Sequence, residues 1–286
     1  MLPPANMLSE PENLPTEAVS PPPEGALPPT PAPPLRPREI WSARDLLLFV
    51  ASLPFALILS KIVVLIGYVV LRPFAGWRAP AEAAQSETIF LLVEQGVFYV
   101  LIVGFLFLLA RLRHHQPFWK SMGWKMPTVT QALIYLAGGG GLALAVSLAL
   151  SVRPDSQPFP LERLFNSRTA SYAIGIFAIG VAPAVEELVF RGLLFAILER
   201  AVGLRFAVVA TAALFAGLHV PEYWHAWHHI FMILVVGLVF SFARGSTGSL
   251  TPSIILHIGY NALIITGLFV STQHFRTGAG WWIRGW

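Results

Sequence analysis

Long runs of apolar residues, joined by short polar connections, make up most of the chain after residue 45. The runs cover 46–71, 88–110, 129–151, 170–198, 205–220, 229–243 and 252–271. The first four are long enough to cross a hydrocarbon core as helices, which takes about 20 residues. Helices are expected because an isolated strand cannot satisfy its backbone in lipid. The pattern predicts an all-α, polytopic transmembrane helix bundle with about seven spans.

The fifth and sixth runs, 205–220 and 229–243, are shorter than a full crossing. Irregular backbone at membrane depth is tolerated where protein or water surrounds it. We therefore expect these two segments to be thin, tilted with their neighbours, or partly re-entrant.

The composition agrees with a membrane protein. Hydrophobic residues make up 55% of the chain and charged residues 12%, roughly half the charged fraction of a soluble domain. The net charge of +4 comes from Lys and Arg scattered at segment ends, so no nucleic-acid partner is expected. The absence of cysteine excludes disulfides and thiolate catalysis. The connections assigned to the inner side carry the larger share of basic residues, which favours a cytoplasmic N-terminus.

Residues 1–40 are rich in proline, for example in Pro21-Pro22-Pro23. This composition predicts a disordered tail, because proline denies helix hydrogen bonds and few large apolar residues are present. A ligand for a proline-recognising partner is the less favoured alternative. No cleavable signal peptide is expected, since the first apolar run begins near Leu46.

Two features of the apolar runs predict helix packing. Lys61 and Glu94 lie in the first and second runs, at comparable depth if these form an antiparallel pair, and a neutralising ion pair is expected because lone charges are costly in lipid. Gly138 to Gly141 fall inside the third run. In a membrane such small residues let two helices approach closely.

The fourth run carries adjacent carboxylates in Glu186-Glu187, followed by Arg191. Glu187 and Arg191 are four residues apart and share one helix face, which suits an ion pair. Glu186 is left without that partner, and a carboxylate in a low-dielectric site can act as a general base. Pro183, one turn earlier, is expected to free a carbonyl and bend the helix.

Further polar residues lie at helical spacing in the later runs. Phe215 and His219 end the fifth run, and His257 and Asn261 share one face of the seventh. One histidine alone would be interpreted as a packing residue, but this concentration in one apolar third of the chain predicts a shared site. The histidines of the connection 220–229 are interpreted as interfacial residues, with metal binding as the alternative.

The three motifs together resemble the CAAX-protease and bacteriocin-processing (Abi) family of intramembrane peptidases. They are Glu-Glu-x-x-x-Arg, Phe-x-x-x-His and His-x-x-x-Asn, each at the family's spacing and in its order, and the resemblance covers about 165–271. The segment Arg244 to Leu250 is also similar. The resemblance implies an N-terminal transmembrane part at 41–165, a catalytic core at 166–272 and a short tail at 273–286.

The resemblance implies a role for each motif residue. Glu186 would activate a water with help from His219, while His257 and Asn261 would stabilise the oxyanion. Glu187 and Arg191 would shape the site, which would open on the cytoplasmic side. If the enzyme is metal-dependent, Glu186, His219 and His257 would be ligands of zinc. No cofactor is otherwise expected, and the helices carry no His-Glu-x-x-His motif.

The expected function is hydrolysis of peptide bonds in membrane-associated peptides, prenylated or signal-like, by an integral protein of a bacterial plasma membrane. The partners are then a peptide or membrane-protein substrate and the lipid bilayer. The alternatives are a catalytically idle peptide-binding or immunity protein, and a proton-coupled transporter with intramembrane Glu and His. The expected depths of the two histidines in the membrane raise one difficulty. His219 ends one run and His257 begins another, with a single run between them, so they meet only near mid-membrane or if a run does not cross fully.

Overall fold

The computed structural model describes residues 40–75, 87–152, 165 and 167–275. All but the last residue of the expected disordered tail at 1–40, and most of the short tail at 273–286, lie outside these residues. The described part contains helices and turns and no strand. Among the described residues, six helices are long and apolar enough to cross a membrane, and there is one shorter apolar helix. The predicted all-α transmembrane bundle of about seven spans is confirmed.

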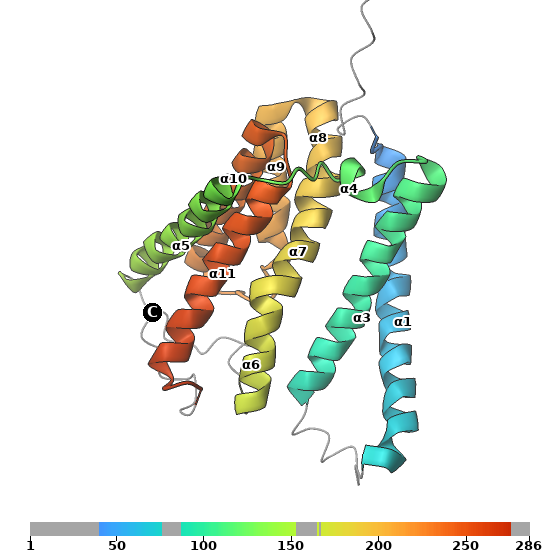
Figure 1. The fold of residues 1–286 in the computed structure, drawn as a ribbon, viewed down its shortest axis with the longest axis vertical. Helices are drawn as coiled ribbons and strands as arrows, with labels where there is room; N and C mark the ends of the chain where they lie inside the picture. The colour runs from blue at the N-terminus through green and yellow to red at the C-terminus, as the bar shows by residue number, and fades with distance from the viewer. Residues whose placement is uncertain (1–39, 76–86, 153–164, 166, 276–286) are drawn as a thin grey trace, which may run out of the picture. The chain divides into compact units, whose positions relative to one another are not determined.

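The helices follow one another along the described parts of the chain (Figure 1). They are α1 (Ala43–Ala75), α3 (Glu87–Leu108), α4 (Phe118–Ser121), α5 (Val129–Ser151), α6 (Arg168–Ile176), α7 (Ala182–Glu187), α8 (Phe195–Val202), α9 (Leu204–Leu218), α10 (Trp227–Thr247) and α11 (Thr251–Ser271). Local sequence signals mark several ends. Thr128 and Gln131 form a capping box at α5, and Gly248, at φ 62°, ends α10 in the left-handed conformation that glycine favours.

The fourth apolar run forms one long helical segment, 168–202, that is interrupted twice. Five residues, Phe177–Val181, and seven residues, Leu188–Leu194, are π-helical. The first of these wider turns lies directly before Pro183, where the sequence predicted a local distortion. This segment is the most buried of the six candidate spans, at 39% of its most apolar window. It is therefore the central helix of the bundle.

The sixth apolar run is longer than its sequence suggested. The structure extends it to Trp227–Thr247, or 21 residues, which is enough to span. The expectation of a short sixth segment is wrong because polar residues belong to the helix. The Arg244 side chain is buried, and its Nε donates to the Arg191 carbonyl over 2.8 Å. Arg244 therefore lies inside the bundle, whereas the apolar pattern predicted that the sixth segment ends just before it.

The ion pair predicted between the first two runs is present. Lys61 Nζ lies 2.6 Å from Glu94 Oε1 and joins α1 to α3. These two helices run side by side at one edge of the bundle (Figure 1). Their outer faces carry exposed large apolar side chains such as Phe55, Leu65 and Val69, as expected for surfaces that face lipid. The pair removes an isolated charge from that surface.

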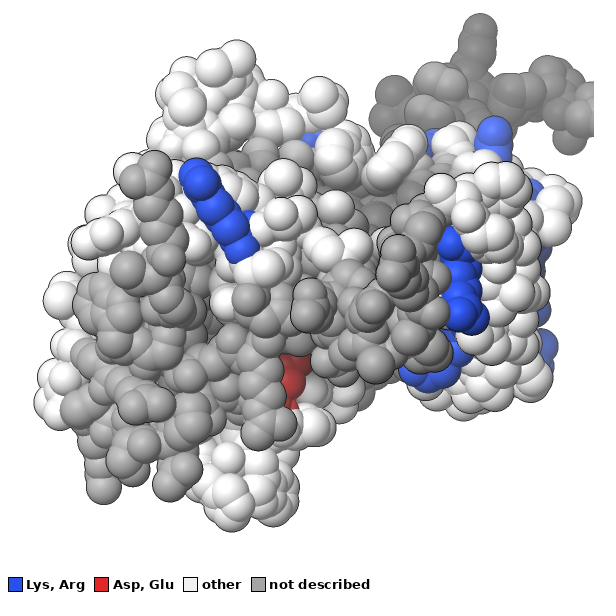
Figure 2. All heavy atoms as spheres, turned by 90° about the horizontal axis from the view of Figure 1, so that it is seen from below, with Lys and Arg blue, Asp and Glu red and all other residues white. Residues whose placement is uncertain are grey.

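Surface charge is sparse on the described residues. Seen from below, the described surface is mostly uncharged, and Lys and Arg lie apart from an acidic surface near the middle of that face (Figure 2). This view looks along the helices onto one end of the bundle, where charged side chains can reach water.

The glycine run packs two helices closely, as the sequence predicted. Gly139 on α5 faces the Leu256 carbonyl on α11, and Gly259 on α11 faces the Leu136 carbonyl on α5. A Cβ at either glycine would overlap that backbone oxygen. The two helices therefore depend on these glycines for their contact, and α11 carries two of the site residues.

We expect Gly139→Ala to lower the free energy of unfolding by about 1–3 kcal/mol, because the added methyl overpacks a backbone contact. Thermal unfolding of the purified protein in detergent measures this loss. Gly141→Ala is the matched control, since a Cβ at Gly141 meets nothing within 4 Å. Equal unfolding temperatures for the two variants would contradict the assignment of Gly139 to the α5–α11 contact.

Candidate active site

The adjacent carboxylates Glu186 and Glu187 lie on the short α-helical turn of α7, between the two π-helical segments. π-helical turns often occur at functional sites because they change the direction of side chains and free backbone carbonyls. The side chain of Glu186 is 26% exposed, whereas that of Glu187 is fully buried. The two neighbours therefore occupy different environments.

Glu187 forms the predicted ion pair with Arg191. Arg191 Nη1 lies 2.9 Å from Glu187 Oε1, and both side chains are fully buried. The guanidinium also donates to α10, from Nη2 to the Gly237 carbonyl over 3.0 Å and from Nε to Ser241 Oγ over 3.3 Å. Its carbon lies 4.6 Å from the centre of the Phe215 ring. Arg191 is thus fixed on several sides and ties the central helix to α9 and α10.

His257 on α11 connects the two carboxylates. Its Nδ1 lies 3.0 Å from Glu187 Oε1, and its Nε2 lies 3.8 Å from Glu186 Oε2. Because a carboxylate only accepts, the contact with Glu187 places a proton on Nδ1. The buried pair of Glu187 and Arg191 therefore sets the orientation of His257, and this orientation directs Nε2 toward Glu186.

His219 follows the last residue of α9. Its Nδ1 lies 2.9 Å from the Phe215 carbonyl oxygen. A carbonyl can only accept, so Nδ1 carries the proton and, in the neutral ring, Nε2 keeps a lone pair. Phe215 also brings the two histidines together, with ring centres 4.9 Å from His219 and 6.0 Å from His257. His219 is thereby prepared to accept a proton or bind a cation at Nε2.

The length of α9 explains how His219 and His257 meet. The helix has 15 residues, or about 22 Å at 1.5 Å per residue, which is less than the roughly 30 Å of a hydrocarbon core. His219 therefore lies inside the bundle and not at its far surface. The difficulty of depth raised by the sequence is resolved because the fifth segment is short, as predicted, while the sixth is not.

Asn261 lies one turn after His257 on α11. Its Nδ2 donates to the Ala178 carbonyl over 2.7 Å, and Ala178 belongs to the first π-helical segment. The hydrogen bond uses one of the two amide hydrogens. Asn261 therefore holds the π-helical turn and keeps its second amide hydrogen as a donor. The Asn261 side chain also lines a cavity inside the bundle.

A cavity of about 430 Å³ joins these groups. Four motif residues line it, namely Glu186, His219, His257 and Asn261, and Phe215 lies between the histidines. Glu187 and Arg191 are not among its lining residues. Much of the remaining wall is apolar and comes from α5, α10 and α11: Val146, Leu150, Met232, Ile233, Val236 and Ile264. The motif residues thus divide into four that face the cavity and two that support them.

Sequence reasoning missed part of the cavity wall. Glu222, Tyr223 and His229, from the α9–α10 connection and the start of α10, also line it. The Tyr223 and His229 rings stack with centres 5.5 Å apart, and burial raises the pKa of Tyr223 to about 12, so its phenol stays neutral at ordinary pH. Trp224 and Trp227 are exposed, as expected for interfacial residues. The aromatic and histidine residues of this connection are evident in the sequence. How deeply they lie in the bundle depends on the length of α9, which the sequence pattern does not fix.

The three candidate zinc ligands do not form a metal-binding group in the structure. Within the part of the chain that the structure describes, no three His, Cys, Asp or Glu side chains are arranged to hold a metal ion. His257 uses Nδ1 on Glu187, and Nδ1 of His219 contacts the Phe215 carbonyl. These contacts leave Nε2 of each histidine available, and metal-ligating histidines make the same kind of contact through their other ring nitrogen. Zinc binding therefore stays a prediction, and the steps proposed for catalysis use only the side chains of this chain.

Comparison with known families finds one match in this part of the chain. Residues 168–263 match the Rce1-like family model, described as type II CAAX prenyl endopeptidase Rce1-like. Comparison with curated proteins and with solved structures found no match. The matched span contains all seven residues of the three motifs, and the resemblance inferred from the motifs is confirmed there. The six apolar helices support an integral membrane protein, and the match makes residues 168–263 similar to CAAX-type prenyl endopeptidases.

Proposed function

We propose that this chain, whose residues 168–263 form an Rce1-like region, is an intramembrane endopeptidase in which Glu186 activates the attacking water. One observation carries the proposal: Glu186, His219, His257 and Asn261, which come from three separate helical segments, line the same cavity. A base, a lone pair and hydrogen-bond donors around one space are what hydrolysis of a peptide bond needs. Roles for the individual residues follow from their contacts.

The first step is attack of water on the scissile carbonyl. Glu186 takes one proton from the water, and His219 Nε2 accepts a hydrogen bond from the same water and orients it. The water oxygen bonds to the carbonyl carbon, and the carbonyl becomes an oxyanion. Glu186 suits this role because it is partly exposed to the cavity, whereas Glu187 is held by Arg191.

The oxyanion is stabilised by donors on α11. Asn261 and His257 both line the cavity, so the proposed donors are the second amide hydrogen of Asn261 and, when both ring nitrogens carry protons, Nε2–H of His257. Donors that are already held in place need no reorganisation when the oxyanion forms, which is why they strongly lower the activation barrier of this step. In the final step the C–N bond breaks and the proton held by Glu186 passes to the leaving amine, which restores the carboxylate.

The cavity also bears on the substrate. Its apolar wall suits the apolar side chains or lipid group of a membrane-associated peptide, and a site within the bundle is reached most directly by a segment already in the bilayer. We propose membrane-embedded or prenylated peptides as the substrate class.

The cytoplasmic location of the N-terminus stays a prediction.

The proposal is tested with purified protein and a panel of membrane-embedded and prenylated peptides, each with and without a chelator. His219→Ala is expected to lower kcat by about 10²-fold or more, because the water loses its second partner. His225→Ala is the matched control, since His225 is exposed and lies in the same connection outside the cavity wall.

Each result of this experiment has a distinct meaning. Cleavage that depends on His219 and resists the chelator supports the glutamate mechanism. Cleavage that a chelator abolishes and zinc restores would replace it with a metal mechanism. If the wild type cleaves no peptide of the panel, or His219→Ala cleaves as fast as His225→Ala, the proposal is wrong.

A further inference from the structure

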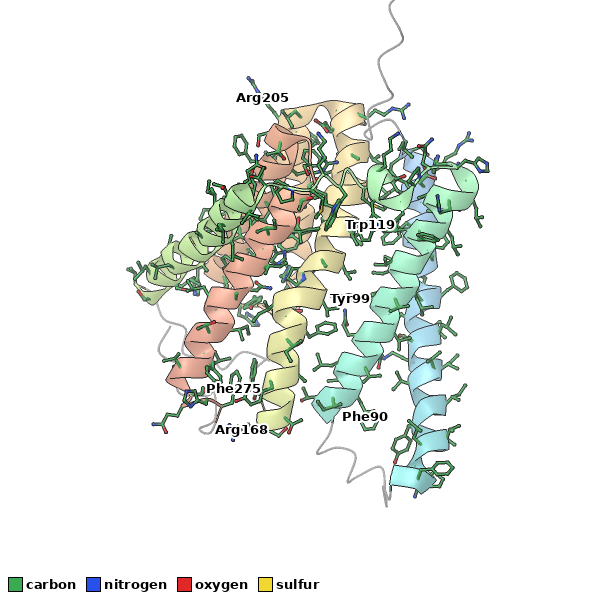
Figure 3. All side chains as sticks on the ribbon, viewed as in Figure 1. Phe90, Tyr99, Trp119, Arg168, Arg205 and Phe275 are labelled. Carbon is green, nitrogen blue, oxygen red and sulfur yellow. The ribbon has the colours of Figure 1, made fainter. Side chains whose placement is uncertain are left out.

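A tyrosine outside the motif-bearing region contacts the candidate base. Tyr99 lies on α3, before the span 168–263 that matches the family model. Its side chain hydrogen-bonds with the side chains of Glu186 and Gln95. Figure 3 shows Tyr99 on the side of α3 that faces the central helix. The first pair of helices thus contributes a polar group to a site formed otherwise by the later helices.

Packing holds the Tyr99 ring against the same turn that positions Asn261. The ring stacks on Phe177 with centres 5.6 Å apart and an angle of 19° between the planes. Phe177 is the first residue of the π-helical segment, and the next residue, Ala178, accepts the Asn261 hydrogen bond. The phenol therefore approaches Glu186 from a ring that is held by stacking.

The donor and the acceptor in the hydrogen bond between Tyr99 and Glu186 follow from the chemistry of the two groups. A carboxylate only accepts, so the phenol O–H donates to Glu186, and the Gln95 amide can donate to the phenol oxygen. Hydrogen bonds to charged acceptors are the stronger ones. Glu186 lacks the guanidinium contact that fixes Glu187, and His257 Nε2 is 3.8 Å away from it. The phenol is thus a donor that can fix the rotation of this carboxylate.

We propose that Tyr99 is a positioning residue of the peptidase site: its phenol donates to one Glu186 oxygen and turns the other toward the water in the cavity. This inference rests on the proposed function of Glu186. It also gives the α1–α3 pair a part in the site. The ion pair of Lys61 and Glu94 joins α3 to α1, and Glu94 directly precedes Gln95.

Tyr99→Phe isolates the hydroxyl, because phenylalanine keeps the ring that stacks on Phe177. We expect kcat to fall about tenfold with KM unchanged, since the base loses a donor that orients it while the cavity wall stays the same. The matched control is Tyr172→Phe, because Tyr172 lies on α6 near Arg168 and Phe269 and outside the cavity wall. A purely structural role for Tyr99 predicts wild-type kinetics for Tyr99→Phe, and that result would overturn the inference.

Infrared spectroscopy tests the contact without relying on activity. The carboxyl band of Glu186 is assigned by its loss in Glu186→Gln, and Tyr99→Phe is expected to shift this band while Tyr172→Phe leaves it in place. A shifted band without any wild-type cleavage would keep the contact and reject the proposed function. An unshifted band would reject the contact itself, whatever the protein cleaves.

Discussion

Glu186→Gln is expected to lower the rate of peptide cleavage by about 10²–10⁴-fold, the usual contribution of a general base. The amide has nearly the same shape and can still accept the Tyr99 hydrogen bond, but it cannot take a proton from water. Because Glu186 is only partly buried and does not share the Arg191 ion pair, the substitution is expected to leave the fold intact. Initial rates at matched concentrations of folded protein measure the loss.

Glu199→Gln provides the matched control for this substitution. Glu199 belongs to the same long helical segment, 168–202, and lies outside the cavity wall. Its variant should cleave at the wild-type rate. If Glu186→Gln kept more than about a tenth of the wild-type rate, Glu186 would not be the base. His219, whose Nε2 is not used in the contact with the Phe215 carbonyl, would take its place in the mechanism.

Removal of either partner of the Glu187–Arg191 pair is expected to lower the free energy of unfolding by about 3–5 kcal/mol, because the remaining charge stays buried without compensation. Glu187→Gln leaves the guanidinium, and Arg191→Met leaves the carboxylate. Both side chains are fully buried, so solvent cannot screen the charge that remains. Thermal or denaturant unfolding in detergent measures each loss.

The double variant Glu187→Gln/Arg191→Met distinguishes an ion pair from two unrelated contacts. With both charges gone, it should unfold at a smaller cost than the sum of the single variants. Cleavage should be weak in the two variants that carry Glu187→Gln, because His257 Nδ1 then faces an amide in place of the carboxylate. Single variants as stable as the wild type, or losses that simply add, would contradict the buried pair.

Residue spacing predicted the contacts that lie within one helix or between adjacent small residues. The separation of four residues identified Glu187 with Arg191, and the glycine run predicted the close contact of α5 and α11. Lys61 and Glu94 were expected to pair because lipid gives an isolated charge no other favourable partner. Each of these predictions needs only local geometry or the cost of an unpaired charge.

Other parts of the site depend on features that hydropathy does not record. The π-helical turn at Phe177–Val181 widens the helix without changing which residues are apolar. The sixth helix continues through Arg244 because the Arg191 carbonyl accepts its Nε. Tyr223 and His229 reach the cavity because α9 ends early. A contact such as that of Tyr99 with Glu186 joins segments 87 residues apart in the sequence, and no local pattern predicts it.

The most direct test of the central claim follows oxygen from water into the product. Wild-type protein and Glu186→Gln are incubated with a cleaved peptide in water enriched in ¹⁸O, and the new carboxyl terminus is analysed by mass spectrometry at early times. The account predicts one ¹⁸O in the wild-type product and almost no product from Glu186→Gln. Product from Glu186→Gln at the wild-type rate, or wild-type product without ¹⁸O, would contradict it.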